Sequence, residues 1–597
     1  MIKKILIISI ALFALIAFSA SQVTASSNSI KFYQMEKGKM LNNAKSMALP
    51  GLSGGRAVFM IGSYPSVAVT LNESKASLYT LKLRYSKPVG ISTDLGVYLN
   101  GKWKKKITIP ATGSLATWRN FSFELSLPNG KSTLLLKKST KPDSIALDYV
   151  STTLAPLKQT VDISFYEKYQ TIEGFGSFGA KYNYWENAPG NTYYDNAFVN
   201  LMVNNMGLTV TRIELTPDFE PSNDNSDPNS TNNSGFSTSG NYARFIPYIK
   251  AYIGAGSTKV IATVWSPPAW MKTNNSTVNG GSLRIDMYEE FAEFLSTYSK
   301  FFKRDTGVDL FGISLQNELE FVETYNSCVY TFSEYADLMK VVGERFKKDG
   351  ITTKIFGPEG MLSSVGNSTM NYIYYMNDNN SIQYLSAIAV HGYSNGVDAD
   401  SPAPALWESD SSVAKEFNKQ IWMTETSGYT HDWASTMGVD SNGNAVVQTP
   451  GAFQGAQDIY CALKYGKISL WTWWASSDRT FSVYSLTANG VPGKKVWASK
   501  QFFRYIRPGA VQVGSSSKIN DIKVIAFKNA SENTATIVLL NTGSIARQFE
   551  ISTRAGSLPK SFKMYRTSST EDCLDVGTTS TSVNIPAQSI MTLYGTY

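Results

Sequence analysis

The chain has 597 residues, more than one compact core usually holds, so we expect several domains. Its net charge of +8 is not gathered into a basic run, which argues against nucleic acid as a partner. Three scattered cysteines exclude a disulfide framework, and two histidines without metal-ligand spacing exclude a catalytic zinc site. Carboxylates therefore remain as the carriers of catalytic chemistry.

The first 25 residues have the organisation of a secretory signal peptide. Lys3 and Lys4 precede an apolar run over 5–18, and small residues around Ala25 form a cleavage site. The run is too short to cross a bilayer, and no later segment is long and apolar enough to do so. We therefore expect a secreted protein, extracellular or periplasmic, with no membrane span. We further expect a monomer.

Residues 28–153 alternate apolar and polar side chains in short runs. Turn residues such as Asn100-Gly101 separate the runs. A period of two with turns at this spacing is typical of antiparallel strands. The pattern predicts an N-terminal β-sandwich.

From residue 161 to 510 the pattern changes to short apolar runs separated by amphipathic helices. Eight such runs occur, at 174–179, 208–215, 259–266, 310–318, 353–360, 387–393, 420–425 and 468–474. Eight buried strands alternating with helices predict a (β/α)₈ TIM barrel. A long loop rich in Asn, Ser, Asp and Gly is expected at 221–240. Short strands return over 511–597 and predict a second, smaller β-sandwich.

Catalytic groups of such a barrel lie at the C-terminal ends of its strands. Glu318 ends the fourth run and Glu425 the seventh, so the two glutamates are expected to face each other across the mouth. Polar and aromatic residues end the other runs and are candidate substrate-binding residues: Arg212, Trp265, Asn317, His391, Tyr393, Trp473 and Trp474. We interpret Glu214 and Glu359 as hydrogen-bonding residues of the wall.

Two facing carboxyl groups suit the hydrolysis of an acetal. Retention of configuration needs one ionised and one protonated carboxyl about 5–5.5 Å apart. Arg212 is expected to keep one glutamate ionised, and that anion then raises the pKa of the other. A non-catalytic glycan-binding protein that kept the barrel as a scaffold is the alternative. The joint presence of Glu318, Glu425, Asn317 and Arg212 argues against it.

Several ordered motifs carry a family resemblance. They are QTIEGFG at 170–176, WSPPAWMKTN at 265–274, SLQNE at 314–318, WMTE at 422–425 and FRYIRPGA at 503–510. With these motifs the sequence resembles glycoside hydrolase family 30.

The resemblance implies roles for the residues of these motifs. Glu318 would be the general acid/base, Glu425 the nucleophile, and Asn317 the contact to a sugar 2-hydroxyl. It also implies a strand from about 160–170 in the C-terminal sandwich, and no cofactor is expected for catalysis. Leu319 stands where the family usually has proline, so we expect an altered fourth loop.

The N-terminal region is similar to carbohydrate-binding modules of families 6 and 35. The similarity rests on Tyr33 to Glu36, Gly54-Gly55, Leu99 to Gly101, Trp118 and Asp148-Tyr149. It implies that Glu36 and Asp148 are candidate ligands of a structural calcium. Trp118 is either a stacking platform for a sugar or a core residue.

The family resemblance leaves the glycan open. An export signal and a binding-type module favour a plant-type polysaccharide over a lipid, and we favour endo action on xylan or glucuronoxylan. Alternatives are an endo-β-1,6-glucanase, a β-1,6-galactanase or a glucosylceramidase-like enzyme. Arg479 lies near the position where glucuronate-reading members carry arginines, but the surrounding pattern does not match.

Overall fold

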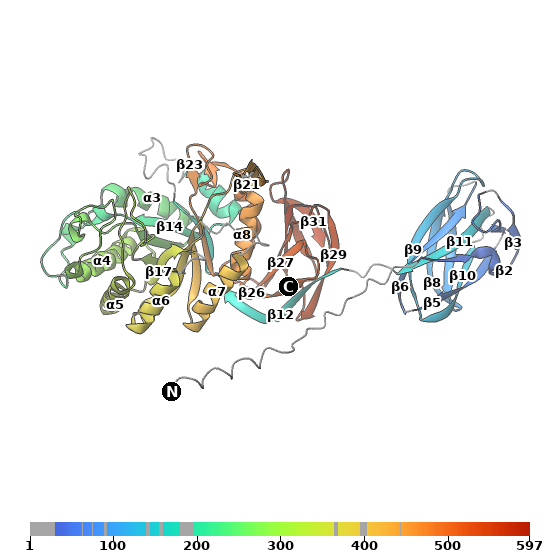
Figure 1. Ribbon diagram of the computed structural model, residues 1–597, viewed down its shortest axis with the longest axis horizontal. Helices are drawn as coiled ribbons and strands as arrows, with labels where there is room; N and C mark the ends of the chain where they lie inside the picture. The colour runs from blue at the N-terminus through green and yellow to red at the C-terminus, as the bar shows by residue number, and fades with distance from the viewer. Residues whose placement is uncertain are drawn as a thin grey trace, which may run out of the picture. The chain divides into compact units, whose positions relative to one another are not determined.

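The computed structural model describes residues 30–597 except 50, 63, 75, 89–91, 139–143, 155–158, 180–194, 363–367, 394–402 and 442. The predicted signal peptide (1–25) lies outside the described residues. The chain separates into two compact units, Met1–Leu157 and Lys158–Tyr597 (Figure 1). No helix in the described part of the chain is both long and apolar enough to span a membrane.

The first unit is the predicted β-sandwich. One antiparallel sheet has the order β3-β4-β11-β6-β9, with β1 paired to β11, and the other has the order β2-β5-β10-β7-β8. Its elements are β1 (Lys31–Gln34), η1 (Met35–Lys37), β2 (Lys39–Leu41), β3 (Ala44–Met47), β4 (Ala57–Ile61), β5 (Ser66–Glu73), β6 (Ser77–Ser86), β7 (Ser92–Leu99), β8 (Lys102–Pro110), β9 (Arg119–Leu127), β10 (Gly130–Lys138) and β11 (Ser144–Leu154). Alternate residues such as Leu95, Val97 and Leu99 fill the core between the sheets, as period-two patterning requires.

The second unit contains the predicted (β/α)₈ barrel. Eight parallel strands close in the order of the chain: β13 (Gly174–Phe178), β14 (Val210–Leu215), β15 (Lys259–Val264), β16 (Gly312–Ser314), β17 (Lys354–Met361), β18 (Leu385–His391), β19 (Gln420–Glu425) and β22 (Leu470–Trp473). Each predicted apolar run overlaps one of these strands. The prediction of the barrel is therefore confirmed.

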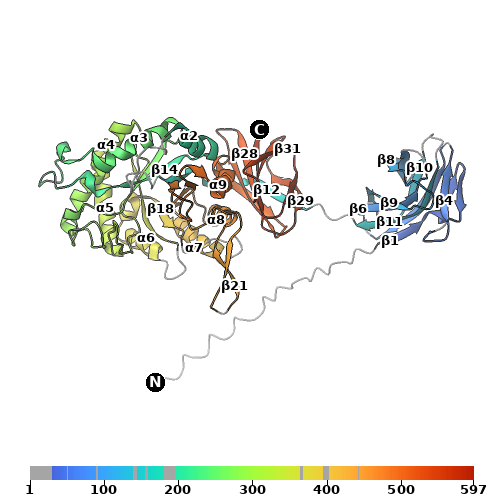
Figure 2. The same cartoon turned by 90° about the horizontal axis from the view of Figure 1, so that it is seen from above.

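Helices surround the barrel strands (Figure 2). They are α2 (Asn196–Val199), the π-helix η2 (Asn200–Met206), α3 (Gly240–Gly254), α4 (Tyr288–Thr306), α5 (Phe332–Asp349), α6 (Ser368–Asp378), α7 (Ala403–Glu416), α8 (Ala452–Lys464) and α9 (Lys494–Phe503). The long helix α4 buries phenylalanines such as Phe291, Phe294 and Phe302 against the barrel. The helix is capped after Thr306 by Gly307, which has a φ of +80°. Its apolar face therefore anchors it to the strands.

Short elements occur in the loops of the barrel. They are η3 (Pro217–Phe219), η4 (Asn233–Gly235), η5 (Ala269–Met271), η6 (Ile285–Met287), η7 (Ser381–Tyr384), β20 (Thr436–Val439), β21 (Ala445–Thr449), β23 (Ser477–Asp478), β24 (Thr487–Ala488) and β25 (Val491–Pro492). One of them, η4, lies within the predicted 221–240 loop, and η3 lies just before it. The loop therefore has some local structure.

The predicted C-terminal β-sandwich completes the second unit. Its strands are hydrogen-bonded in the order β31-β30-β33-β28-β27-β26-β12-β29-β32. They are β12 (Thr160–Thr171), β26 (Val511–Ser517), β27 (Ile522–Asn529), β28 (Thr534–Asn541), β29 (Arg547–Ala555), β30 (Phe562–Thr567), β31 (Leu574–Thr579), β32 (Ser582–Ile585) and β33 (Ser589–Thr596). Strand β12, which precedes the barrel in the chain, lies between β26 and β29. Apolar residues such as Phe527 and Leu540 share one core with the barrel helices, so the sandwich packs on the barrel.

Candidate active site

A pocket of about 770 Å³ opens at the C-terminal ends of the barrel strands. Glu318 and Glu425 both line it, as the sequence predicted. Four other predicted substrate-binding residues line it too: Trp265, Asn317, Tyr393 and Trp474. The strand ends therefore bring together residues that are more than two hundred positions apart in the chain.

Glu425 is the last residue of β19 and is held by donors on both carboxylate oxygens. The guanidinium of Arg212 donates to Oε2, and the hydroxyl of Tyr393 donates to Oε1 across 2.8 Å. One donor on β14 and one just after β18 fix the orientation of this carboxylate. Glu425 is only 6% exposed, so it presents little more than its carboxylate to the pocket.

Glu318 follows β16 with a backbone φ of +42°, in the left-handed region that non-glycine residues rarely adopt. Its Oε1 lies 2.9 Å from Nδ1 of His391. The preceding residue, Asn317, accepts a hydrogen bond from Arg212 across 2.9 Å. Leu319, which stands in place of the family's proline, is fully buried. This leucine therefore packs in the core and does not enter the pocket.

Behind the two glutamates lies a fully buried layer formed by Arg212, Glu359 and His391. The second guanidinium nitrogen of Arg212 lies 3.1 Å from Glu359 Oε1, and His391 Nε2 lies 3.6 Å from the same oxygen. Arg212 and His391 do not line the pocket. Their side chains point at carboxylates and not at the open volume, so in this structure they act on the two glutamates and have no direct access to the pocket.

The charges of this layer shift the pKa values of its members. Burial alone would raise the pKa of Glu359, but Arg212 and then His391 lower it to about 2. Burial alone would lower the pKa of His391, but Glu425 and Glu318 raise it to about 9. For Glu425, burial is the largest influence and raises the pKa against the opposing effects of His391 and Arg212. Arg212 thus secures the ionised state most firmly at Glu359, which the sequence did not indicate.

The charges of the buried layer do not balance by themselves. The pKa shifts favour positive charge on Arg212 and His391 and negative charge on Glu359. An unbalanced charge is costly in a buried site, so one further carboxylate charge at the mouth is favoured. One ionised and one protonated carboxyl is the state that acetal hydrolysis requires.

The two carboxyl groups are also close together. Oxygens of Glu318 and Glu425 and a ring nitrogen of His391 lie within 4.8 Å of one another. This spacing suits a retaining pair better than the wider separation of about 6.5–9.5 Å in inverting enzymes. The three residues have the geometry of a metal site. However, protonated His391 offers no lone pair to a cation, and the existing cations already balance the carboxylates.

One predicted residue lies elsewhere. Trp473 packs against Tyr429 and Trp471, and its indole donates to Ser499 of α9 across 2.9 Å. Trp473 is therefore packed beside α9 and is not among the residues that line the pocket. Successive strand residues point to opposite faces, so the next residue, Trp474, is the one that lines the pocket.

Several pocket residues come from loops that strand patterns do not reveal. They are Val278, Tyr325, Asn326 and Tyr484, and the strands add Glu214 from β14 and Met361 at the end of β17. Asn326 donates to Glu214 across 3.0 Å, so Glu214 is bonded within the wall as expected. The tyrosines are half exposed, which leaves their ring faces free for a sugar. A further stretch rich in aromatic residues, at 181–186 after the first barrel strand, lies outside the described residues.

In the N-terminal sandwich, Trp118 is half-buried and lies beside Arg84, whose guanidinium carbon is 5.4 Å from its ring centroid. Arg84 also pairs with Asp148, which accepts hydrogen bonds from Ser53. One oxygen of Glu36 is buried without a hydrogen-bond partner among the described residues. The two candidate calcium ligands therefore differ. Asp148 already pairs with the cation Arg84, whereas one oxygen of Glu36 has no partner among the described residues.

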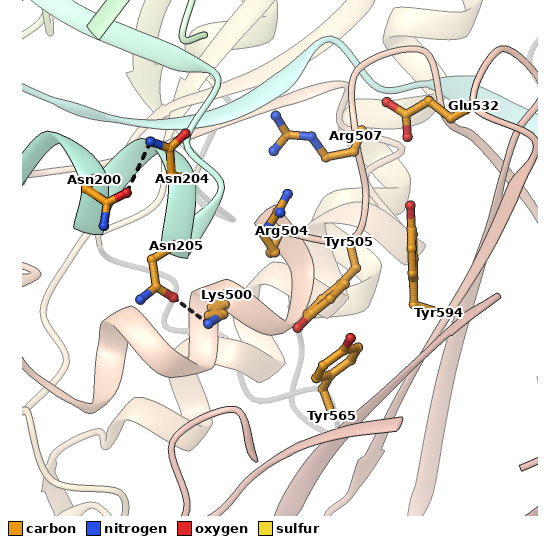
Figure 3. Close-up of a pocket in the computed structure, with 10 residues that line it drawn as sticks. All are labelled: Asn200, Asn204, Asn205, Lys500, Arg504, Tyr505, Arg507, Glu532, Tyr565 and Tyr594. Carbon is orange, nitrogen blue, oxygen red and sulfur yellow. Dashed lines mark hydrogen bonds between the residues drawn. The ribbon is translucent and has the colours of Figure 1, made fainter. Parts of the chain in front are cut away.

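A second pocket of the second unit, of about 510 Å³, lies between η2, α9 and the C-terminal sandwich (Figure 3). Lys500, Arg504 and Arg507 surround it, and Tyr505 stacks on Tyr565 with ring centroids 4.5 Å apart. Glu532 is its single carboxylate. This pocket therefore cannot perform chemistry that needs two carboxyl groups.

Two domain families match the second unit. Residues 193–437 match the "Glycosyl hydrolase family 30 TIM-barrel domain", and residues 509–593 match the "Glycosyl hydrolase family 30 beta sandwich domain". The chain belongs to glycoside hydrolase family 30. It is therefore a glycoside hydrolase, and glycosidases of this family need no cofactor for catalysis.

Known family 30 proteins resemble the chain at low identity. "Glucuronoxylanase XynC" of Bacillus subtilis (strain 168) is 23% identical over 451 residues, which cover 74% of this chain and 92% of that protein. "Putative glucosylceramidase 4" of Caenorhabditis elegans is 25% identical over 50% of this chain and 60% of that protein. The catalytic domain of xylanase C from Talaromyces cellulolyticus superposes with a TM-score of 0.60 at 22% identity, over 74% of this chain and 100% of that domain. The structural likeness establishes the fold.

Proposed function

We propose that this family 30 protein is a retaining hydrolase of β-linked polysaccharide, with Glu425 as the nucleophile and Glu318 as the general acid/base. The observation that carries the proposal is the pair itself: two carboxyl groups at the mouth of the barrel have oxygens within 4.8 Å of each other. The family resemblance of the motifs around each residue supports the division of roles.

In the first step Glu425 attacks the anomeric carbon while the glycosidic bond breaks. The proton of Glu318 passes to the leaving oxygen, so an alcohol departs and a glycosyl ester forms on Glu425. The hydrogen bonds from Tyr393 and Arg212 hold the attacking carboxylate in place. As Glu318 becomes negative, protonated His391 at 2.9 Å stabilises the new charge.

In the second step water attacks the same anomeric carbon. Glu318, now ionised, accepts a proton from that water, and the ester bond to Glu425 breaks. The sugar leaves with a hydroxyl on the face it started from. Glu425 recovers its negative charge and Glu318 its proton, so the starting state is restored.

We propose xylan or glucuronoxylan as the substrate, cleaved at internal bonds. One support is the similarity to a protein named glucuronoxylanase. The other is that the walls of the open pocket are aromatic, with Trp265, Trp474, Tyr325 and Tyr484. The similarity to a protein named glucosylceramidase keeps a glucosylceramide-type substrate as the second candidate. β-1,6-Glucan and β-1,6-galactan complete the panel to be tested.

We also propose that the protein is exported and that its N-terminal sandwich binds carbohydrate. The signal-like sequence of residues 1–25 supports export. The pairing of Arg84 with the face of Trp118 supports a polar and aromatic surface of the kind that binds sugars.

The test compares wild type, Glu425→Gln and Glu344→Gln on this panel of glycans. Glu344 is exposed on α5, so its substitution is a matched control outside the pocket. We expect wild type and Glu344→Gln to release reducing sugar and Glu425→Gln to release almost none. Equal inactivity of all three on every glycan would favour a non-catalytic binding protein.

Proton NMR of early products tests the stereochemistry separately. A β-linked substrate should first yield the β-anomer. An initial α-anomer would refute retention while leaving the assignment of the two carboxyl groups intact.

A further inference from the structure

A second group of carboxylates lies between α4 and the loop that follows β14. Figure 1 shows the two elements that supply them. Glu220 and Asp224 come from the loop, and Glu290 and Glu293 come from the first half of α4. Oxygens of Asp224, Glu290 and Glu293 lie within 4.8 Å of one another. None of the four residues lines the catalytic pocket.

These carboxylates are buried without adequate partners. Glu220 and Glu293 are each 1% exposed, and neither oxygen of either side chain has a hydrogen-bond partner among the described residues. One oxygen each of Asp224 and Glu290 is likewise unpartnered. Burying a carboxylate without a partner is among the most costly arrangements in a protein.

The neighbouring cation does not resolve this cost. Arg345 comes no closer than 3.8 Å to Glu293, and its hydrogen bonds go to Asp349 and to the carbonyl of Pro228. Asn223 reaches one oxygen of Glu290 across 3.4 Å. The group therefore has more negative charge than the surrounding side chains balance.

The charge excess is visible in the protonation of the group. Burial, followed by the charge of Asp224, raises the pKa of Glu220 to about 8. Burial is also the first cause that raises the pKa of Glu293 to about 7. Both shifts have the direction expected of buried carboxylates that lack a neutralising cation.

We propose that Glu220, Asp224, Glu290 and Glu293 bind a calcium ion. Calcium takes six to eight oxygen ligands in flexible geometry, and four carboxylates with further oxygens from an Asn- and Asp-rich loop suit it. The group contains no histidine or cysteine, which disfavours zinc and other softer metals. This inference concerns a site apart from the catalytic pair and does not rest on the glycan that the enzyme cleaves.

The ion would join the loop to the barrel wall. Glu220 accepts a hydrogen bond at its carbonyl from the indole of Trp270 across 3.1 Å, and Trp270 follows closely after the pocket residue Trp265. Calcium would therefore hold the 221–240 loop and one side of the mouth in place. Loss of the ion is expected to loosen the loop before it affects the buried catalytic pair.

The experiment uses the full chain after dialysis against a chelator. Calorimetric titration with calcium chloride is expected to give saturable binding, and an excess of calcium is expected to raise the Tm by roughly a few degrees. The variant Glu220→Gln/Glu293→Gln should lose both effects. Without calcium this variant should melt above wild type, because the substitution removes repulsion between carboxylates.

The matched control is Glu36→Gln/Asp148→Asn, which removes the candidate ligands of the N-terminal sandwich. This control should keep the binding heat and the Tm shift that we assign to the α4 site. If the control abolishes them and Glu220→Gln/Glu293→Gln keeps them, the proposal is overturned. Absence of calcium binding and of a Tm shift in wild type would overturn it as well.

Terbium luminescence provides a readout that does not depend on the folding of the double variant. Trp270 lies beside the proposed site and can transfer excitation energy to bound terbium. Calcium should displace terbium and quench this emission in wild type, and Trp270→Phe should reduce the emission severalfold. Undiminished emission in Trp270→Phe would contradict this location for the ion.

Discussion

His391 is expected to keep its proton at neutral pH although its side chain is fully buried. Burial opposes the charge, but Glu425, Glu318 and Glu359 raise the pKa of His391 from 6.5 to about 9. This rise corresponds to about 3 kcal/mol of folding free energy, at about 1.4 kcal/mol for each tenfold change in the proton equilibrium. The contribution is present in full below pH 6.5 and is lost as the pH rises through 9.

The variant His391→Gln removes this titration while keeping a donor near Glu318. In chemical unfolding followed between pH 6.5 and 9.5, wild type should lose about 3 kcal/mol more stability than the variant. The comparison of slopes with pH isolates the imidazolium, because a general packing defect would lower the stability of the variant equally at every pH.

Ring-labelled histidine NMR gives a direct check, since the chain has only two histidines. One signal should titrate near pH 9 and disappear in His391→Gln. The other should titrate near pH 4 and disappear in His431→Gln, because burial, followed by the charge of Lys495, lowers the pKa of His431 to about 4. Titration of the His391 signal at its ordinary pH, or no difference in slope between wild type and variant, would refute the reasoning.

Three further substitutions test the pocket and the N-terminal sandwich. Tyr393→Phe should lower kcat about 10- to 100-fold, because it removes a hydrogen bond of about 1.5–3 kcal/mol to the Glu425 carboxylate, and an unchanged kcat would contradict this. Trp474→Ala should raise KM about two- to tenfold through loss of a stacking surface, whereas Trp473→Phe should leave KM unchanged in steady-state assays. Trp118→Ala should weaken retention of the full chain on insoluble xylan without changing kcat on a short soluble substrate. Equal retention of the variant and wild type would indicate that Trp118 is a core residue and not a sugar platform.

The fold could be predicted because each of its parts has a strong periodic signal. Alternation in residues 28–153 forces a sheet with one buried face, and eight apolar runs between amphipathic helices leave few arrangements other than a closed barrel. The order of hydrogen-bonded strands in the C-terminal sandwich has no such signal. The placement of β12 depends on pairing between residues that are hundreds of positions apart, and its family resemblance was the cue that pointed to it.

The site could be predicted only as far as strand ends reveal it. Knowing that a residue ends a strand does not say whether its side chain points into the mouth or behind it. Trp473 and Trp474 are adjacent, yet one packs on α9 and the other lines the pocket, because neighbouring strand residues face opposite sides. Tyr325 and Tyr484 lie on loops, where no periodicity marks a functional position.

The buried layer explains why Arg212 and His391 matter although neither lines the pocket. A pair of glutamates alone would repel in the ionised state and would be inert as a nucleophile when both are protonated. Arg212 and His391 supply two positive charges, and Glu359 cancels one of them, so one further negative charge at the mouth is favoured. Removal of Glu359 would leave excess positive charge and favour ionisation of the remaining glutamates, so the general acid would be lost first. The third carboxylate, interpreted from the sequence only as a wall residue, thus takes part in the charge balance of the other two.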